Sequence, residues 1–197
     1  MQLIIHKHFT VYMKNTTSTI IILLLFFGCA PNISLTKLKS DFKEYDVLVS
    51  NGEYEKVIEF MPTDFWNIYE KNEFLANTKR VGKKFDSLSI GNMKIENVSK
   101  TIKSNNKYFK VITYSTELEF DSSNISDIMH ENFKSDFGAE NVKLDTINKQ
   151  FKINNNSQMI SVYDDKLEVW KYLEYNPQTI IKIYGIETGT KLIKYVR

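Results

Sequence analysis

Two glutamates in one alternating segment are the residues of this chain best spaced for acid–base chemistry. Glu117 and Glu119 fall on the same face of a strand expected over 107–120. Asp121 follows them directly. A carboxylate held in a pocket beside a tyrosine can act as a general base, but the nearby Tyr114 faces the opposite side from Glu117. We therefore favour a solvent-facing role for both glutamates.

Histidine and serine chemistry find little support in the sequence. The chain has three histidines, and two of them, His6 and His8, lie close to its N-terminus. His130 stands beside Glu131 with no partner at the spacing of a metal site. The sequence contains no Gly-x-Ser-x-Gly motif and no glycine-rich phosphate loop. We expect no catalytic set, no metal and no cofactor.

Aromatic residues offer a different kind of candidate, a binding patch. Its members are Trp66, Tyr69, Trp170 and Tyr172. In a strand expected over 166–173, Trp170 and Tyr172 face the same side as Glu168. Large aromatic side chains either line an open hollow or form a buried face beneath a helix. We favour packing, and the patch stays as the alternative.

The single cysteine follows an apolar run. Residues 20–27 are all Ile, Leu or Phe, and Gly28 and Cys29 come next. A run this short fits the core of a signal peptide, which needs about 7–15 apolar residues, rather than a membrane span of about 20. The pattern resembles the lipobox of bacterial lipoproteins, with Phe26 where that family prefers Leu. The resemblance implies cleavage before Cys29, acylation of Cys29 and anchoring to a membrane by lipid.

The lipoprotein interpretation divides the chain into three parts. Residues 1–28 are the signal peptide, within which 1–12 are either an over-extended start or a long first region. Residues 29–36 form a lipidated tether, and 37–197 form one domain. No acidic residue lies close behind the cysteine. In the lipoproteins that it resembles, this favours the periplasmic face of the outer membrane in the cell envelope.

The charge balance argues against a nucleic-acid partner. The chain has 26 Lys and Arg against 24 Asp and Glu. Lys7 and Lys14 precede Cys29, and no acidic residue does, so the remaining segment carries equal numbers of both signs. Nucleic-acid binders normally carry a basic excess or stripe. No second cysteine is present, so an internal disulfide is excluded.

The first half of the domain has helical periodicity. Apolar residues recur at helical spacing over 35–49 and again over 54–61, before Pro62. A third short helix is expected over 65–69, with Thr63 or Asp64 as its cap. Helical spacing resumes from Phe74 to Phe85.

Strand periodicity then takes over. Alternation over 88–95 slips in phase at Gly91, which predicts a bulge. Asn105-Asn106 predicts a turn into the long strand 107–120. The remaining expected elements are a helix over 123–137 capped by residues 121–123, strands over 142–144 and 151–153, a turn at 154–156, a hairpin of 158–163 with 166–173 around Asp164-Asp165, and a terminal helix from Asn176-Pro177.

This order predicts an α+β fold, with N-terminal helices packed on a curved antiparallel sheet. The phrase from Asn51 to Phe60 resembles the turn and helix after the first helix of NTF2-like (cystatin-like cone) domains. The segments 133–145, 159–164 and 170–175 resemble uncharacterised Bacteroidota lipoproteins built on such a domain. The resemblance covers most of residues 35–176. The helix over 123–137 is an insertion between strands relative to the plain cone.

Taken together, these features predict a lipid-anchored envelope protein that is a non-catalytic binding or interaction module. Its expected partners are the membrane, through the lipid, and either an envelope protein or a small apolar ligand. The alternative is a small-molecule enzyme of the NTF2-like type that uses a pocket carboxylate as general base.

Overall fold

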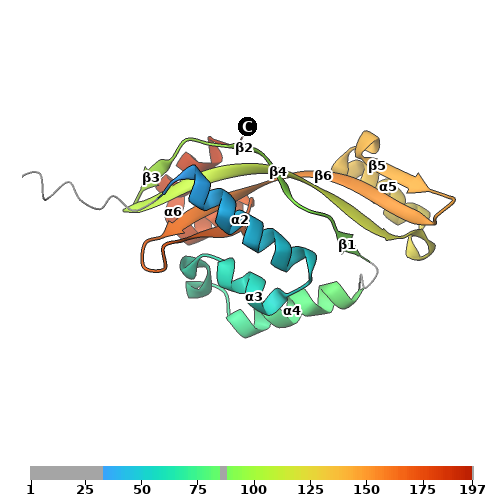
Figure 1. Cartoon of the computed structure of the whole chain (residues 1–197), viewed down its shortest axis with the longest axis horizontal. Helices are drawn as coiled ribbons and strands as arrows, with labels where there is room; N and C mark the ends of the chain where they lie inside the picture. Colours follow the sequence, from blue (N-terminus) through green and yellow to red (C-terminus); the bar gives the residue numbers. More distant parts are fainter. Residues whose placement is uncertain (1–32, 85–87, 197) are drawn as a thin grey trace, which may run out of the picture. The chain divides into compact units, whose positions relative to one another are not determined.

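The computed structural model of the chain describes residues 33–84 and 88–196. The proposed signal peptide, Cys29 and the first part of the tether lie outside the described residues. The described chain is α+β, with helices first and an open antiparallel sheet of seven strands after them (Figure 1). The predicted fold class is thus confirmed at this level. None of the helices described is both long and apolar enough to cross a bilayer.

The N-terminal helices follow the predicted order. They are α2 (Leu35–Ser50), α3 (Tyr54–Val57), the 3-10 helices η1 (Ile58–Phe60) and η2 (Thr63–Asn67), and α4 (Lys71–Lys84). Ser34 caps α2 by accepting the Lys37 N–H at 3.1 Å. The predicted cap of the third helix is wrong, because η2 begins after Pro62 without a side-chain cap. Asp64 instead forms an ion pair with Lys107 at 2.5 Å.

A pair of long antiparallel strands forms the centre of the sheet. Its strands β4 (Lys107–Asp121) and β6 (Gln150–Asp164) pair from Phe109 opposite Val162 to Asp121 opposite Gln150. The other edge of β4 takes β1 (Ser89–Ile90), β2 (Lys94–Val98) and β3 (Ile102–Ser104) in succession, whereas the other edge of β6 takes β5 (Val142–Asp145) and β7 (Val169–Glu174).

Two predicted irregularities of the sheet are confirmed. Asn105 and Asn106 have φ of 46° and 58°, and they join Ser104 to Lys107 in the two-residue turn that suits the right-handed twist of a hairpin. The phase slip at Gly91 separates β1 from β2, and the Gly91 N–H donates to the Glu117 carbonyl at 2.7 Å. A second register shift follows within β2.

The predicted turn at 154–156 is wrong. Strand β6 runs through all three asparagines, which pair with residues 115–117 of β4. The turn lies at 146–149 instead, because the Asp145 carboxylate accepts the N–H groups of Ile147 and Asn148 at 3.0 and 2.9 Å. The hairpin from β6 to β7 is present, but β7 begins only at Val169.

Both later helices start where a side chain caps them. Helix α5 (Asp127–Phe137) begins after Ser126, and Gly138 ends it with φ of 87°. The predicted cap at 121–123 instead belongs to the short 3-10 helix η3 (Ser122–Asn124). The 3-10 helix η4 (Ala139–Asn141) leads into β5. Asn176 caps α6 (Pro177–Ile193) as predicted, and Gly185 breaks α6 with φ of 79°.

Because successive side chains of a strand point to opposite faces, the buried residues of the sheet form separate clusters on its two faces. Ile112 and Tyr114 of β4 pack with Leu38 and Phe42 of α2. Their neighbours Phe109 and Val111 point the other way, into a cluster with Ile180 and Leu192 of α6. Further along the β4–β6 pair, Phe120 and Phe151 pack with Phe133 of α5. Figure 1 shows α2 crossing the sheet and α5 near the far end of the long β4–β6 pair.

Candidate functional site

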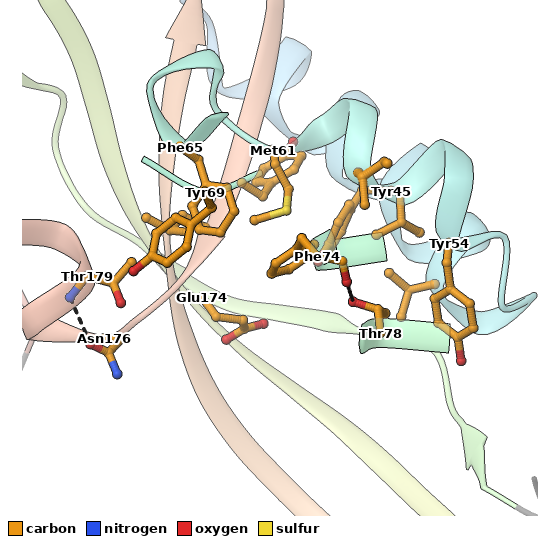
Figure 2. Close-up of a pocket in the computed structure, with 15 residues that line it drawn as sticks. Tyr45, Tyr54, Met61, Phe65, Tyr69, Phe74, Thr78, Glu174, Asn176 and Thr179 are labelled. Atoms are coloured by element: carbon orange, nitrogen blue, oxygen red, sulfur yellow. Dashed lines mark hydrogen bonds between the residues drawn. The ribbon is translucent and has the colours of Figure 1, made fainter. Parts of the chain in front are cut away.

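An apolar pocket lies between the N-terminal helices and β7 (Figure 2). Its volume is about 480 Å³, within the range of sites for small molecules. Six aromatic side chains line it: Tyr45, Tyr54, Phe65, Tyr69, Phe74 and Tyr172. The polar lining residues are Thr78, Glu174, Asn176 and Thr179. Glu174 is therefore the one charged residue among the lining residues that the structure describes.

Regular spacing in each element aims these side chains at the pocket. Tyr45 and Val49 stand four residues apart on α2, so they share a helix face. Phe74 and Thr78 have the same spacing on α4, where the Thr78 hydroxyl donates to the Phe74 carbonyl at 3.0 Å. In this view Glu174 lies between Asn176 on one side and Thr78 on the other (Figure 2).

The polar centre of the site is the contact between Glu174 and Tyr114. The Tyr114 hydroxyl donates to Glu174 Oε1 at 2.5 Å. Glu174 keeps access to solvent through the open pocket, but protein surrounds its carboxyl group closely enough that burial raises the pKa of this group. The hydrogen bond from Tyr114 acts in the opposite direction and moderates the rise. Burial is also the main cause that raises the pKa of Tyr114.

Tyr45 stands near the same carboxylate. Burial raises the pKa of its phenol, and the negative charge of Glu174 raises it further. At neutral pH both tyrosines are therefore neutral, and Glu174 is the group of the three that titrates nearest to that range. The site combines one carboxyl group with a neutral aromatic lining.

Tyr172 is a fixed wall of the pocket. Its hydroxyl donates to the Leu38 carbonyl at 3.1 Å, and its ring lies 5.1 Å from the ring of Tyr45 and 5.6 Å from that of Phe42. Strand β7 is held against α2 by a second contact, because Asp41 accepts the backbone N–H of Trp170 at 2.9 Å. These contacts set the position of Glu174 two residues further along the strand.

The structure brings together two of the four aromatic residues proposed from sequence. Tyr69 and Tyr172 line the pocket. Trp170 is fully buried in the core beneath α2, and Trp66 packs edge-on against Phe65 at 4.9 Å. Neither tryptophan belongs to the lining.

The carboxylates considered from sequence lie elsewhere. Glu117 and Glu119 of β4 form ion pairs with Lys152 of β6 on a polar surface of the sheet. His130 packs edge-on against the ring of Phe151 at 4.9 Å, so its role in the structure is a packing one. Across residues 33–84 and 88–196, no three His, Cys, Asp or Glu side chains gather closely enough to hold a metal ion.

Glu174 was not among the residues singled out from sequence. The sequence does place Glu174 on the same face of β7 as two aromatic residues. Trp170, Tyr172 and Glu174 are alternate residues of one strand, so their side chains point to the same side. The alternation shows that Glu174 follows two large aromatics, but not that a hollow opens at its end of the strand. The hollow is formed by side chains of α2, α3 and α4 together with β7, and this arrangement is a property of the tertiary structure.

A second hollow of about 340 Å³ lies near the β3–β4 turn, and three of its charged side chains have partners within the protein. Lys107 binds Asp64, and the Lys171 ammonium donates to the Glu59 carbonyl. Burial lowers the pKa of Lys171. Because these groups satisfy one another, the aromatic pocket is the stronger candidate.

Comparisons with protein-family models, curated proteins and solved structures find no match to this chain.

Proposed function

We propose that this protein is a binding module for a small, largely apolar molecule, which it holds in the pocket beside Glu174. The observation that carries the proposal is an open cavity of about 480 Å³ with six aromatic walls and one carboxyl group. Sites of this size and composition bury most of the surface of a small ligand, and a few polar groups orient it. Had Phe and Tyr side chains filled this space, an interaction surface would be the better proposal.

Filling the pocket tests this proposal. A neutral fluorescent probe, N-phenyl-1-naphthylamine, is titrated into the protein and excited in its own absorption band. We expect saturable binding that Val49→Trp weakens by about tenfold or more, equivalent to ~1.4 kcal/mol. Val47→Trp is the matched control, because Val47 is on the same helix, is 47% exposed and does not line the pocket. Equal binding by both variants would contradict the proposal.

An enzyme that uses Glu174 as general base is the second candidate. The observation that favours it is a carboxyl group with a raised pKa, hydrogen-bonded to a tyrosine inside an apolar pocket. A base of this kind removes a proton from carbon beside a carbonyl group. A panel of small ketones in D₂O, followed by proton NMR, should then show deuterium exchange that Glu174→Gln abolishes. Exchange equal to the buffer rate in both proteins would leave the binding module as the better account.

We also propose that the domain is NTF2-like and that lipid on Cys29 anchors it to the cell envelope, at the periplasmic face of the outer membrane. Helices followed by an antiparallel sheet support the first part. The apolar run before Gly28-Cys29 supports the second. Labelled fatty acid should be incorporated into the full chain expressed in bacteria and not into Cys29→Ala. Equal labelling of both forms would refute lipidation.

A further inference from the structure

The carboxylate of the pocket has no counter-ion from the protein. No Lys, Arg or His is found among the lining residues, and none of the ion pairs formed within the described part of the chain includes Glu174. A charge that protein surrounds is normally paired, because its lost hydration must be replaced. The Tyr114 hydroxyl replaces part of it at Oε1. The empty pocket thus offers one carboxyl group with which a cationic ligand can pair.

The walls of the pocket suit a positive charge as well. Phenyl and phenol rings carry negative potential on their faces and attract ammonium groups within about 6 Å. One ring of the lining already does so, since the Lys182 ammonium lies 4.7 Å from the centre of the Tyr69 ring. Tyr45, near Glu174, keeps its proton and adds no second charge.

A ligand that carries a negative charge fits poorly by the same argument. It would bring a second charge of the same sign to the side of Glu174, and no basic residue among the lining residues offsets it. A neutral ligand would provide no opposite charge for the carboxylate. Only a cation both pairs with Glu174 and gains from the aromatic walls.

We infer that the ligand class is a small lipophilic amine, protonated at neutral pH, whose ammonium group binds Glu174 and whose apolar body occupies the space between Tyr45, Tyr69 and Phe74. This inference rests on the proposed function, because it assumes that the pocket is a binding site. Beyond the proposed function, it states that the ligand is positively charged and that Glu174 is the residue that selects this charge.

Three molecules with the same body and different head groups test the inference: 4-phenylbutylamine, 4-phenylbutanol and 4-phenylbutyrate. Their dissociation constants are measured by calorimetry at neutral pH and low salt. We expect the amine to bind about tenfold or more tightly than the alcohol, in line with a charged hydrogen bond supported by cation–π contacts. The carboxylate should bind most weakly.

Variants identify the residue responsible. Glu174→Gln should weaken amine binding by about tenfold and leave binding of the alcohol within about twofold, because Gln keeps the shape and the acceptor for Tyr114 but not the charge. Glu187→Gln removes the same charge from an exposed position of α6 and should change neither. This control separates a local ion pair from the net charge of the protein.

The outcomes separate the two proposals. If the alcohol binds as tightly as the amine, or if Glu174→Gln binds both as the wild type does, the amine inference is overturned and the pocket stands. If none of the three binds wild type although N-phenyl-1-naphthylamine does, the amine inference is likewise overturned and the pocket stands. If neither the probe nor any of the three binds, or if Val49→Trp affects none of them, the proposed function fails and the inference with it.

Discussion

The Tyr114 hydroxyl and the Glu174 carboxylate meet at 2.5 Å although β6 lies between their strands. Tyr114 stands in β4 opposite Ser157, and Glu174 stands in β7 opposite Met159. The two side chains therefore reach across one strand on the face that α2 partly covers. This contact places a single carboxyl group at the wall of an otherwise apolar pocket.

The raised pKa of Glu174 gives a pH dependence of stability with a defined sign. The folded state binds this proton more tightly than the unfolded chain does, so the stabilisation is complete below the ordinary pKa of 4.5 and is lost as pH rises through the folded pKa. Glu174→Gln resembles the protonated form at every pH. The Tm of this variant should exceed that of wild type by an amount that grows as pH rises above the ordinary pKa of 4.5 and levels off above the folded pKa.

Scanning calorimetry at several pH values measures this difference. Glu187→Gln serves as control, because Glu187 is exposed and the difference from wild type should stay flat. A Tm difference for Glu174→Gln that shrinks with rising pH would show that the carboxylate form stabilises the fold.

Asp41 should contribute more to the free energy of unfolding than its ion pair with Lys37 alone would supply. It is buried, and it accepts both the Lys37 ammonium at 2.7 Å and the Trp170 N–H at 2.9 Å. Asp41→Ala leaves a buried N–H of the edge strand unpaired, which costs about 1–3 kcal/mol. Lys37→Ala removes only the partly exposed partner and should cost about 1 kcal/mol or less.

Urea denaturation of both variants gives the two free energies. Equal losses would mean that the ion pair, and not the backbone contact with β7, is what Asp41 supplies.

Gly189 should not tolerate a side chain. The second half of α6 approaches the first so closely that a Cβ on Gly189 would lie 2.8 Å from Ile181 Cγ1 and 3.0 Å from Ile181 Cα. Because part of this contact is backbone, Gly189→Ala should lower the free energy of unfolding by about 1–3 kcal/mol, despite the higher helix propensity of alanine.

Thr190→Ala is the matched control on the next, exposed position and should change the stability by about 0.5 kcal/mol or less. Thermal denaturation compares the two. A Gly189→Ala variant more stable than wild type would mean that the two halves of α6 separate easily.

Local chemistry explains which parts of the fold were predictable. Asn105-Asn106 forms the predicted turn because two asparagines tolerate positive φ, and α2 follows its apolar spacing. The asparagines at 154–156 have the same composition but lie in a strand, because their backbone groups pair with β4. Pairing between distant segments overrides local preference there.

The candidate site was harder to predict from the sequence than the fold, because it also depends on contacts between distant segments. Tyr69 and Tyr172 could be proposed because large aromatics draw attention in any sequence. Glu174 could not, because its significance comes from Tyr114, 60 residues away in sequence, and from the helices that leave the hollow open. Only the tertiary contacts distinguish it from other glutamates of the chain.

The most direct test of the account is a two-dimensional NMR titration of the isotope-labelled protein with 4-phenylbutylamine. The account predicts saturable shifts concentrated at Tyr69, Phe74 and Glu174, with little change at Phe120 and Phe151 beneath α5. In Glu174→Gln, half-saturation should require about tenfold more ligand. Saturable shifts centred on another surface, or no shifts at all, would contradict the claim that this pocket binds a small cationic ligand.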